Sequence, residues 1–365
     1  MSKVSEYGFT NAKLRARIGD IRSSSLVEDM IHASTLAEAV SKLDGTRHQG
    51  AADIYRRTGD LQQVEMGLLE EEVELYETAA SHLPKAAAGY VMVLLEKVEI
   101  DNLKNAIRLW YAGAVRHHQL KYRTAYISHK RMVHEIDYDK ITNATKWAEV
   151  VAGVSGTPYE AVMQGYDEKS MAGGGLFRLE IDLDHLWFRH VDEGLSRLKG
   201  EDRSIASSIS SIDVDLKNIL MLTRYGYYYH LGPQDLKKVI IPYGYIAQEA
   251  IEKNAMDSDD PVGVLRGIVQ KRYPKISAEI LRIRRSADDL TARAENGAQI
   301  LEIEAYLGKT RADEYRKLLL AHPFSIGVTL CYFYLSRQEN ALISAVLSAK
   351  YYKWDERDLR EELGI

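Results

Sequence analysis

The chain has 365 residues, of which 45% are apolar, and a formal net charge of −5. An apolar content of this size supports a large buried core and excludes a globally disordered chain. The mild acidity gives no reason to expect a surface that coats nucleic acid or an anionic membrane. Only 7 prolines interrupt the chain, so long helices are possible throughout. We therefore predict an all-α protein.

The first third, residues 1–121, opens without the apolar core of a signal peptide. A loop is expected at Asp44-Gly45-Thr46, and a Leu/Glu-rich helix follows at Gly67–Leu83. The third ends in the segment Glu99–Trp110, EIDNLKNAIRLW. Its apolar residues fall on one face of a helix with the spacing i, i+3, i+7, i+10, namely Ile100, Leu103, Ile107 and Trp110.

The second third, residues 122–230, repeats this order. Its start overlaps a basic, aromatic-containing stretch at Val115–His134, which suits docking on an acidic protein surface or a solvated helix and linker; nothing in it resembles an RNA-binding module. Gly173-Gly174-Gly175 predicts a flexible hinge before the Leu/Glu-rich helix Leu176–Leu195. The segment Ile212–Arg224, IDVDLKNILMLTR, closes the third as another amphipathic helix.

The final third, residues 231–365, is an expanded copy. The longer helix Ile300–Leu320 precedes the segment Arg337–Leu347, RQENALISAVL. Leu318–Ser336 contains no Asp, Glu, Lys or Arg, but Pro323 interrupts it, so two buried helical pieces are expected rather than a membrane span. Cys331 lies in this stretch as the only cysteine, which excludes an internal disulfide, fits a reducing cytoplasm and predicts a small buried hydrophobe.

The three segments define one helix used three times. Leu103-Lys104-Asn105 maps onto Leu216-Lys217-Asn218, which places Asn102, Asp215 and Asn340 at one equivalent position. We expect these three side chains to cap or bridge helices within each bundle. In the third copy Ala341 and Leu342 replace the Leu-Lys pair, so the symmetry is expected to be least exact there.

The sequence contains only partial matches to catalytic or metal-binding patterns. Gly308-Lys309-Thr310 resembles the end of a phosphate-binding loop, but Ile303 stands where its first glycine belongs, so an exposed helix segment is expected. Two Asp-x-x-His pairs would each share a helix face, and further glutamates at positions 70–72 complete the residue types of a di-metal bundle. These pairs, Asp29 with His32 and Asp182 with His185, carry the alternative hypothesis of a helical-bundle metalloprotein.

The whole chain resembles the C subunit of archaeal and bacterial A/V-type ATPases, equivalent to the d subunit of the eukaryotic vacuolar proton pump. The resemblance rests on the start YGFTNAKLRAR, on the three repeated segments, and on the C-terminal SRQENALISAVLSAKYYKWDERDLREELG. The family's Tyr-x-x-x-Asn-x-(Lys/Arg)-x-Arg start is matched by Tyr7, Asn11, Lys13 and Arg15, and its acidic final helix by Asp355–Leu363.

This resemblance implies three similar helical bundles that form a funnel, with the repeats at 1–121, 122–230 and 231–365. It implies a non-catalytic connector without a cofactor, which caps the rotor ring of the membrane on its cytoplasmic side and receives the central stalk, built from D-type and F-type subunits. Ion transport would then be coupled to ATP synthesis or hydrolysis. Four basic residues are the candidate partner contacts: Lys104, Arg108, Lys217 and Arg224. A generic helical scaffold is a third hypothesis.

Overall fold

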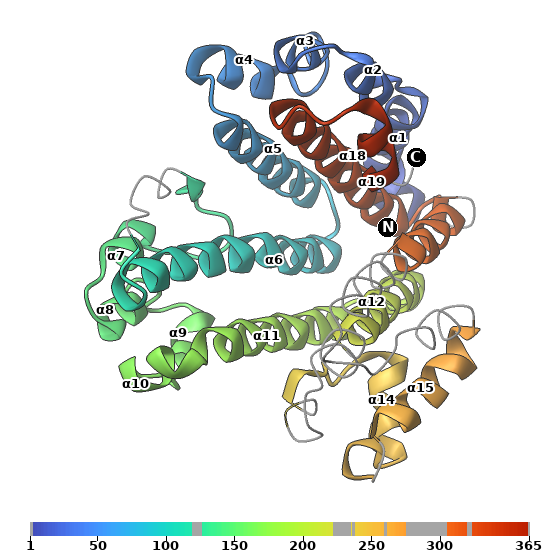
Figure 1. Ribbon diagram of the computed structural model, residues 1–365. Coiled ribbons are helices and arrows are strands. Elements are labelled where there is room, and N and C mark those ends of the chain that lie inside the picture. The colour runs from blue at the N-terminus through green and yellow to red at the C-terminus, as the bar shows by residue number, and fades with distance from the viewer. Residues whose placement is uncertain are drawn as a thin grey trace. The chain divides into compact units, whose positions relative to one another are not determined.

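The computed structural model describes residues 3–118, 126–221, 235, 238–258, 261–274, 305–319 and 323–363. These residues form helices joined by turns and irregular segments, with no β-strand among them, which confirms the all-α prediction (Figure 1). The chain divides into two compact units: unit 1 is Met1–Leu198 with Phe324–Ile365, and unit 2 is Lys199–Pro323. Among the described helices, none has the length and apolar character needed to cross a bilayer. The three repeat boundaries stay a prediction.

Unit 1 contains long helices joined by short ones. The long helices are α1 (Lys3–Ser23), α5 (Leu61–Ser81), α6 (Lys85–Trp110), α11 (Leu176–Arg197) and α18 (Gly327–Tyr351). The short ones are α2 (Leu26–His32), α3 (Leu36–Ser41), α4 (Gln49–Thr58), α7 (Tyr138–Asn143), α8 (Trp147–Ala152), α9 (Pro158–Met163), α10 (Glu168–Ser170) and α19 (Glu356–Leu363).

Local sequence signals set several of these ends. Gly59 ends α4 in the left-handed conformation, with φ of 65°, and its N–H donates to the Tyr55 carbonyl. The next residue, Asp60, accepts a hydrogen bond from the Gln62 N–H and so caps α5. The left-handed conformation favours glycine, and aspartate is a preferred N-terminal cap. The dipeptide Gly59-Asp60 therefore separates two helices within two residues.

One hydrophobic cluster forms where α6 and α11 lie side by side (Figure 1). The predicted apolar face of α6 is buried here, since Ile100, Leu103, Ile107 and Trp110 are at most 3% exposed. The short helices α7, α8 and α9 supply Tyr138, Trp147, Tyr159 and other members, and α11 supplies Leu179, Leu183 and Leu186. The periodicity of the sequence therefore identified the buried side of α6 correctly.

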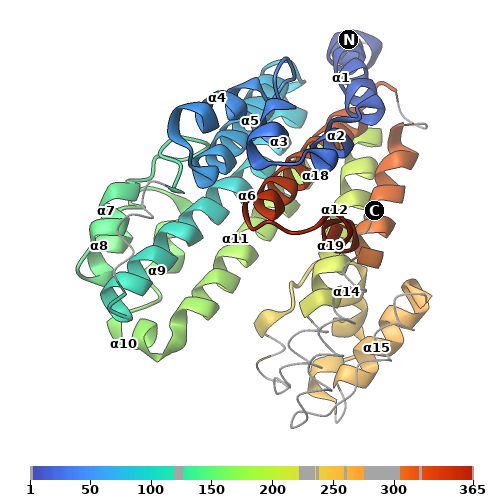
Figure 2. The same cartoon turned by 45° about the horizontal axis from the view of Figure 1, so that its top comes forward.

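A second cluster in unit 1 joins the two ends of the chain. Ile343, Val346 and Leu347 of α18 pack against buried residues of α2, α3, α4 and α5. Figure 2 shows α2 and α3 beside α18, and contacts between these elements agree with that view. The helix expected to end the third repeat thus shares its core with helices expected in the first.

Unit 2 has one core in its described part. Its helices are α12 (Gly200–Met221), α14 (Gly244–Glu252) and α15 (Pro261–Arg272), together with helical residues 305–319. Ile212, Leu216 and Ile219 of α12 are buried in this core, as their helical spacing predicts. The fourth residue of that predicted face, Thr223, lies outside the described residues.

Other expectations can be compared with the structure directly. Cys331 is 1% exposed, which confirms the buried interpretation. Helical residues 305–319 and α18 flank Pro323, so the expected break is confirmed in the described residues. Gly308-Lys309-Thr310 lies within a helix, as expected. Gly173-Gly174-Gly175 joins α10 to α11 as part of a π-helical turn, Met171–Gly175, kinked at Gly174.

Candidate functional site

The Asn102 side chain on α6 forms hydrogen bonds with both backbone groups of Ser128. Its side-chain amide donates to the Ser128 carbonyl at 2.8 Å, and its oxygen accepts from the Ser128 N–H at 3.0 Å. Asn102 and Ser128 are both buried, so these bonds satisfy groups that water does not reach. We call this paired arrangement a backbone clamp.

Asn218 on α12 forms the same backbone clamp. It donates to the Ile241 carbonyl at 3.0 Å and accepts from the Ile241 N–H at 2.9 Å. By their hydrogen bonds, the counterparts are therefore Asn102 and Asn218. The sequence register paired Asn102 with Asp215, which is wrong by one helical turn, because it followed the shared Leu-Lys-Asn letters and not the bonded partners.

A carboxylate precedes each clamp by one turn. Glu99 accepts from the N–H groups of Val133 and His134 at 2.7 and 2.8 Å. Asp215 accepts from the Ile246 N–H at 2.9 Å and from the Tyr273 hydroxyl at 2.9 Å. Each carboxylate thus anchors the segment that follows its clamp.

Asn340 on α18 makes a different contact. Its side chain donates to the Leu68 carbonyl of α5 at 3.4 Å, so it bridges two helices. The sequence predicts that Asn102, Asp215 and Asn340 cap or bridge helices within each bundle. Asp215 and Asn340 do bond other helices, but the bonds of all three side chains join residues of different predicted repeats, so the within-bundle part of this expectation is not confirmed. Asn11 on α1, part of the predicted N-terminal motif, donates to the Ser325 carbonyl just before α18 at 2.9 Å.

Lys104 lies inside unit 1. It is 5% exposed, and its Nζ lies 2.7 Å from the Asp184 carboxylate on α11. Burial lowers the pKa of Lys104, and Asp184 opposes that shift by stabilising the charged form. Lys97 shares the same carboxylate at 3.3 Å. Lys104 therefore ties α6 to α11, and its contact with a partner stays a prediction.

The other three candidate contacts differ in exposure. The Arg108 side chain is 51% exposed and binds Glu180 with two nitrogens, at 2.6 and 2.8 Å. Lys217 is half-buried on α12, and Arg224 lies outside the described residues. Arg108 is thus the candidate whose exposed position within unit 1 is established.

Two buried glutamates on α6 organise a charged network in the first cluster. Tyr159 donates to Glu99 at 2.7 Å, His134 contacts the same carboxylate at 2.7 Å, and His190 contacts Glu96 at 2.8 Å. Burial opposes ionisation of Glu99, but its hydrogen bonds from His134, the backbone and Tyr159 lower its pKa. The bond to Glu99 in turn raises the pKa of His134. The pair therefore favours its charged form.

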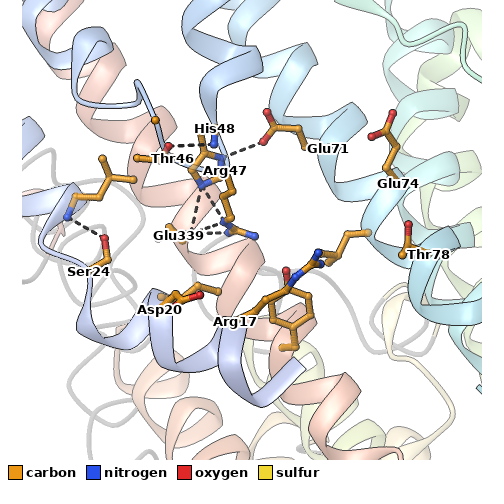
Figure 3. A pocket seen from close by; sticks show the side chains of 15 residues that line it. Arg17, Asp20, Ser24, Thr46, Arg47, His48, Glu71, Glu74, Thr78 and Glu339 are labelled. Atoms are coloured by element: carbon orange, nitrogen blue, oxygen red, sulfur yellow. Dashed lines mark hydrogen bonds and ion pairs between the residues drawn. The ribbon is translucent and has the colours of Figure 1, made fainter. Parts of the chain in front are cut away.

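A cavity of about 630 Å³ opens within unit 1 between α1, the loop before α4, α5 and α18 (Figure 3). His48, 1% exposed, lies between Glu71 at 2.9 Å and Glu339 at 3.3 Å. Arg47 binds Glu339 as well, and its Nη1 donates to Ser336 at 3.0 Å. Arg47, His48 and Glu339 converge in the view, with Glu71 facing the imidazole.

The charges of this cavity satisfy one another. Burial opposes protonation of His48, yet its bonds to Glu339 and Glu71 raise its pKa. Burial likewise opposes ionisation of Glu339, while His48 and Arg47 lower its pKa. The two carboxylates favour the protonated form of His48, and Arg47 binds one of them as well. Arg47, His48, Glu71 and Glu339, which we call the histidine lock, therefore join the segment before α4 to α5 and α18.

Sequence reasoning missed this lock. It marked the loop at Asp44-Gly45-Thr46 and the glutamates 70–72 but assigned no role to Arg47, His48 or Glu339. A basic pair placed directly after a loop and before a helix was the available signal. Its partner Glu339 lies almost the whole chain away, so no local spacing reveals the contact.

The donors of the metalloprotein hypothesis serve other contacts. Asp29 accepts from the Ser25 hydroxyl at 2.7 Å, and His32 lies near Glu28 and Glu356 on an exposed surface. Asp182 accepts from the Tyr166 hydroxyl at 2.5 Å. Across the described ranges, no group of three or more His, Cys, Asp or Glu side chains is placed to hold a metal ion.

Known proteins resemble the chain over most of its length. A family model, the ATP synthase (C/AC39) subunit, matches residues 10–362. The C subunit of the A-type ATP synthase from Methanothermobacter thermautotrophicus is 24% identical over 341 residues, covering 91% of this chain and 80% of that protein. The corresponding C subunits from Pyrococcus horikoshii and Methanocaldococcus jannaschii are each 21% identical, covering 99% of this chain and 91% and 86% of those proteins.

Proposed function

Because this chain belongs to the family of ATP synthase (C/AC39) subunits, we propose that it is a non-catalytic connector in the central stalk of a rotary A/V-type ATPase. In this proposal it caps the membrane rotor ring on the cytoplasmic side and receives the foot of the central stalk. Its partners are the ring subunit and stalk subunits of the D and F type. It is held at the membrane by protein contacts and transmits torque without chemistry of its own.

The observation that carries the proposal is the family match along residues 10–362, which spans both units and extends nearly to both chain ends. The interior of unit 1 supports it. A torque-bearing connector must resist deformation, and close-packed helices do so. Lys104–Asp184 and the Asn102 clamp fix α6 to its neighbours by directional contacts, in addition to the apolar core.

We propose Arg108, Lys217 and Arg224 as partner contacts in this assembly. Lys104 is buried in unit 1 and supports α6, the helix that carries Arg108. Arg108 is 51% exposed on α6 and its guanidinium is oriented by Glu180, so this ion pair lies at the surface of unit 1, where a partner can contact it. Three similar bundles arranged around the stalk remain part of the proposal. Such an arrangement would let an axial shaft contact equivalent helices on several sides.

Purification from membranes tests the proposal. An affinity-tagged chain, isolated in mild detergent from its native cells, is expected to bring down the rotor-ring subunit and the stalk subunits together. Recovery of the folded chain with neither of them would overturn the connector role. Metal analysis of the same preparation separates the alternative, because stoichiometric iron, manganese or zinc would favour a metalloprotein.

A further inference from the structure

A polar hollow of about 760 Å³ on unit 1 is lined by residues of α9, α10 and the glycine turn, and by α11 from Arg178 to Arg189. Figure 1 shows α9 and α10 beside the N-terminal end of α11. Four of its residues fall on one face of α11 at a spacing of three to four, the neighbour spacing of a helix. These residues are Arg178, Asp182, His185 and Arg189. The hollow is separate from the cavity at His48 and from the candidate contacts on α6.

Glycines form the wall of the hollow. Gly174 has φ of 93°, a conformation that side chains other than glycine rarely adopt. A Cβ on Gly175 would lie 2.6 Å from the Ser170 carbonyl oxygen, so this position also requires glycine. The turn from α10 to α11 therefore depends on these glycines for the path that opens the hollow.

Two arginines of the hollow have no carboxylate of their own. Arg178 and Arg189 are exposed, and within the described residues neither forms an ion pair. Other arginines of unit 1 are paired, such as Arg108 with Glu180 and Arg337 with Glu72. Two guanidinium groups without an ion pair, set against the single carboxylate of Asp182, give this concave surface an excess of positive charge that favours an anionic occupant.

The spacing of the charges defines that occupant. Arg178 and Arg189 are separated by about 16 Å along α11, since each residue of a helix rises about 1.5 Å. Between them lies Asp182, whose carboxylate accepts the Tyr166 hydroxyl at 2.5 Å. A negative charge at the centre disfavours a single compact anion such as phosphate. It leaves the two ends to separate carboxylates on one extended segment.

We propose that the hollow on α11 binds an acidic segment of another subunit of the rotary ATPase, with carboxylates engaging Arg178 and Arg189. This proposal rests on the proposed function. The two guanidinium groups set the position of the segment along α11, and half-buried His185 lies beside the Arg189 end. Interactions of this kind determine which partner binds and in which register.

Charge reversal in the tagged, membrane-isolated complex tests it. Arg178→Glu/Arg189→Glu is expected to reduce the recovery of other ATPase subunits by about tenfold, because like charges then face each other. Arg197→Glu/Arg357→Glu is the matched control. It makes the same charge change at side chains that are 72% and 84% exposed, and its recovery should equal that of the wild type. A thermal melt verifies folding, and Arg178→Gln/Arg189→Gln replaces the reversal variant if that variant unfolds.

A photo-crosslinking residue at position 173, where an added Cβ meets nothing within 4 Å, identifies the occupant while Arg178 and Arg189 are both retained. Crosslinks to a segment of another subunit that is rich in Asp and Glu support the proposal, whereas crosslinks confined to lipid contradict it. Equal recovery of the reversal variant and the control also overturns it, while wild-type chain that recovers ATPase subunits keeps the proposed function intact. If the wild type recovers none, the proposed function itself fails.

Discussion

α6 in unit 1 and α12 in unit 2 anchor the following segment by the same backbone clamp but in opposite electrostatic settings. At Glu99, histidine and backbone donors outweigh burial and keep the pKa low. At Asp215, burial outweighs the Ile246 N–H and Tyr273, and the pKa is raised. The clamp geometry is thus independent of the charge beside it. Partners from distant segments, and not the helix itself, decide whether that charge is stabilised.

The largest expected effect concerns the charge that α6 buries through Lys104. Asp184→Ala leaves that ammonium, 5% exposed, without its nearest carboxylate, and should lower the free energy of unfolding by about 3 kcal/mol. Urea unfolding measures it. Asp192→Ala, an exposed site on the same helix, is the control and should change little. If adding Lys104→Met to Asp184→Ala restores none of the lost stability, the buried-charge explanation is wrong.

Removal of either backbone clamp should lower the free energy of unfolding by a somewhat smaller amount. Asn102→Ala and Asn218→Ala each leave a buried backbone N–H and C=O without a partner, so each should lose about 2 kcal/mol. Asn105→Ala tests the same helix at an exposed asparagine and should cost below about 0.5 kcal/mol. Denaturant unfolding compares the three variants. A loss at only one clamp would break the equivalence of α6 and α12.

Neutral substitutions of the two carboxylates should change stability by different amounts in unit 1 and unit 2. Glu99→Gln removes the anion that raises the pKa of His134, and we expect about 1.5 kcal/mol of destabilisation at pH 7. Asp215→Asn removes a charge that burial disfavours, so stability should stay within about 0.5 kcal/mol of the wild type. Calorimetry at pH 7 gives both values. Equal losses would mean that the two charge environments do not differ.

The contributions of Asp215 and Glu99 to stability should also depend on pH with opposite sign. The raised pKa of Asp215 contributes stability below its unfolded value, which is lost as pH rises through the folded value. The lowered pKa of Glu99 contributes stability above its unfolded value, which is lost as pH falls through the folded value. Acidification from neutral pH towards pH 4 should therefore protonate Asp215 before Glu99 and increase the contribution of Asp215 to stability. In Asp215→Asn, thermal melts between pH 4 and 7 should no longer show this contribution.

The contacts of His48 with Glu71 and Glu339 should make stability depend on pH on the alkaline side of neutrality. Its pKa is raised, so its stabilisation is complete below the ordinary value of 6.5 and is lost as pH rises through the folded value. In His48→Gln, unfolding between pH 6 and 9 should lose this component. An unchanged profile in that range would show that the imidazole stays neutral between Glu71 and Glu339.

The smallest effect tests the exposed side of α6. Arg108→Glu breaks a half-exposed ion pair and should cost below about 1 kcal/mol of stability. Arg108→Glu/Glu180→Arg restores the pair with its charges exchanged. If Arg108 contacts a partner, the double variant should regain stability but not the recovery of stalk subunits. Recovery equal to the wild type would remove Arg108 from the interface.

The sequence by itself determined the helices, the buried faces and the family. The i, i+3, i+7 pattern identified Ile100, Leu103 and Ile107 as buried, and Pro323 as a break, because helix periodicity and proline geometry are local properties. The family resemblance rested on motif order along the whole chain, which survives even where identity is low.

Only the tertiary structure decided which polar groups meet. Lys104 was predicted to contact a partner, yet its side chain is buried in unit 1 and binds Asp184 of α11. The clamp register was missed by one turn, because Asn218 is recognised by its bonds to Ile241 and not by its neighbours in sequence. Hydrogen bonds and ion pairs of buried groups join distant segments, so their partners appear only once apolar packing has brought those segments together.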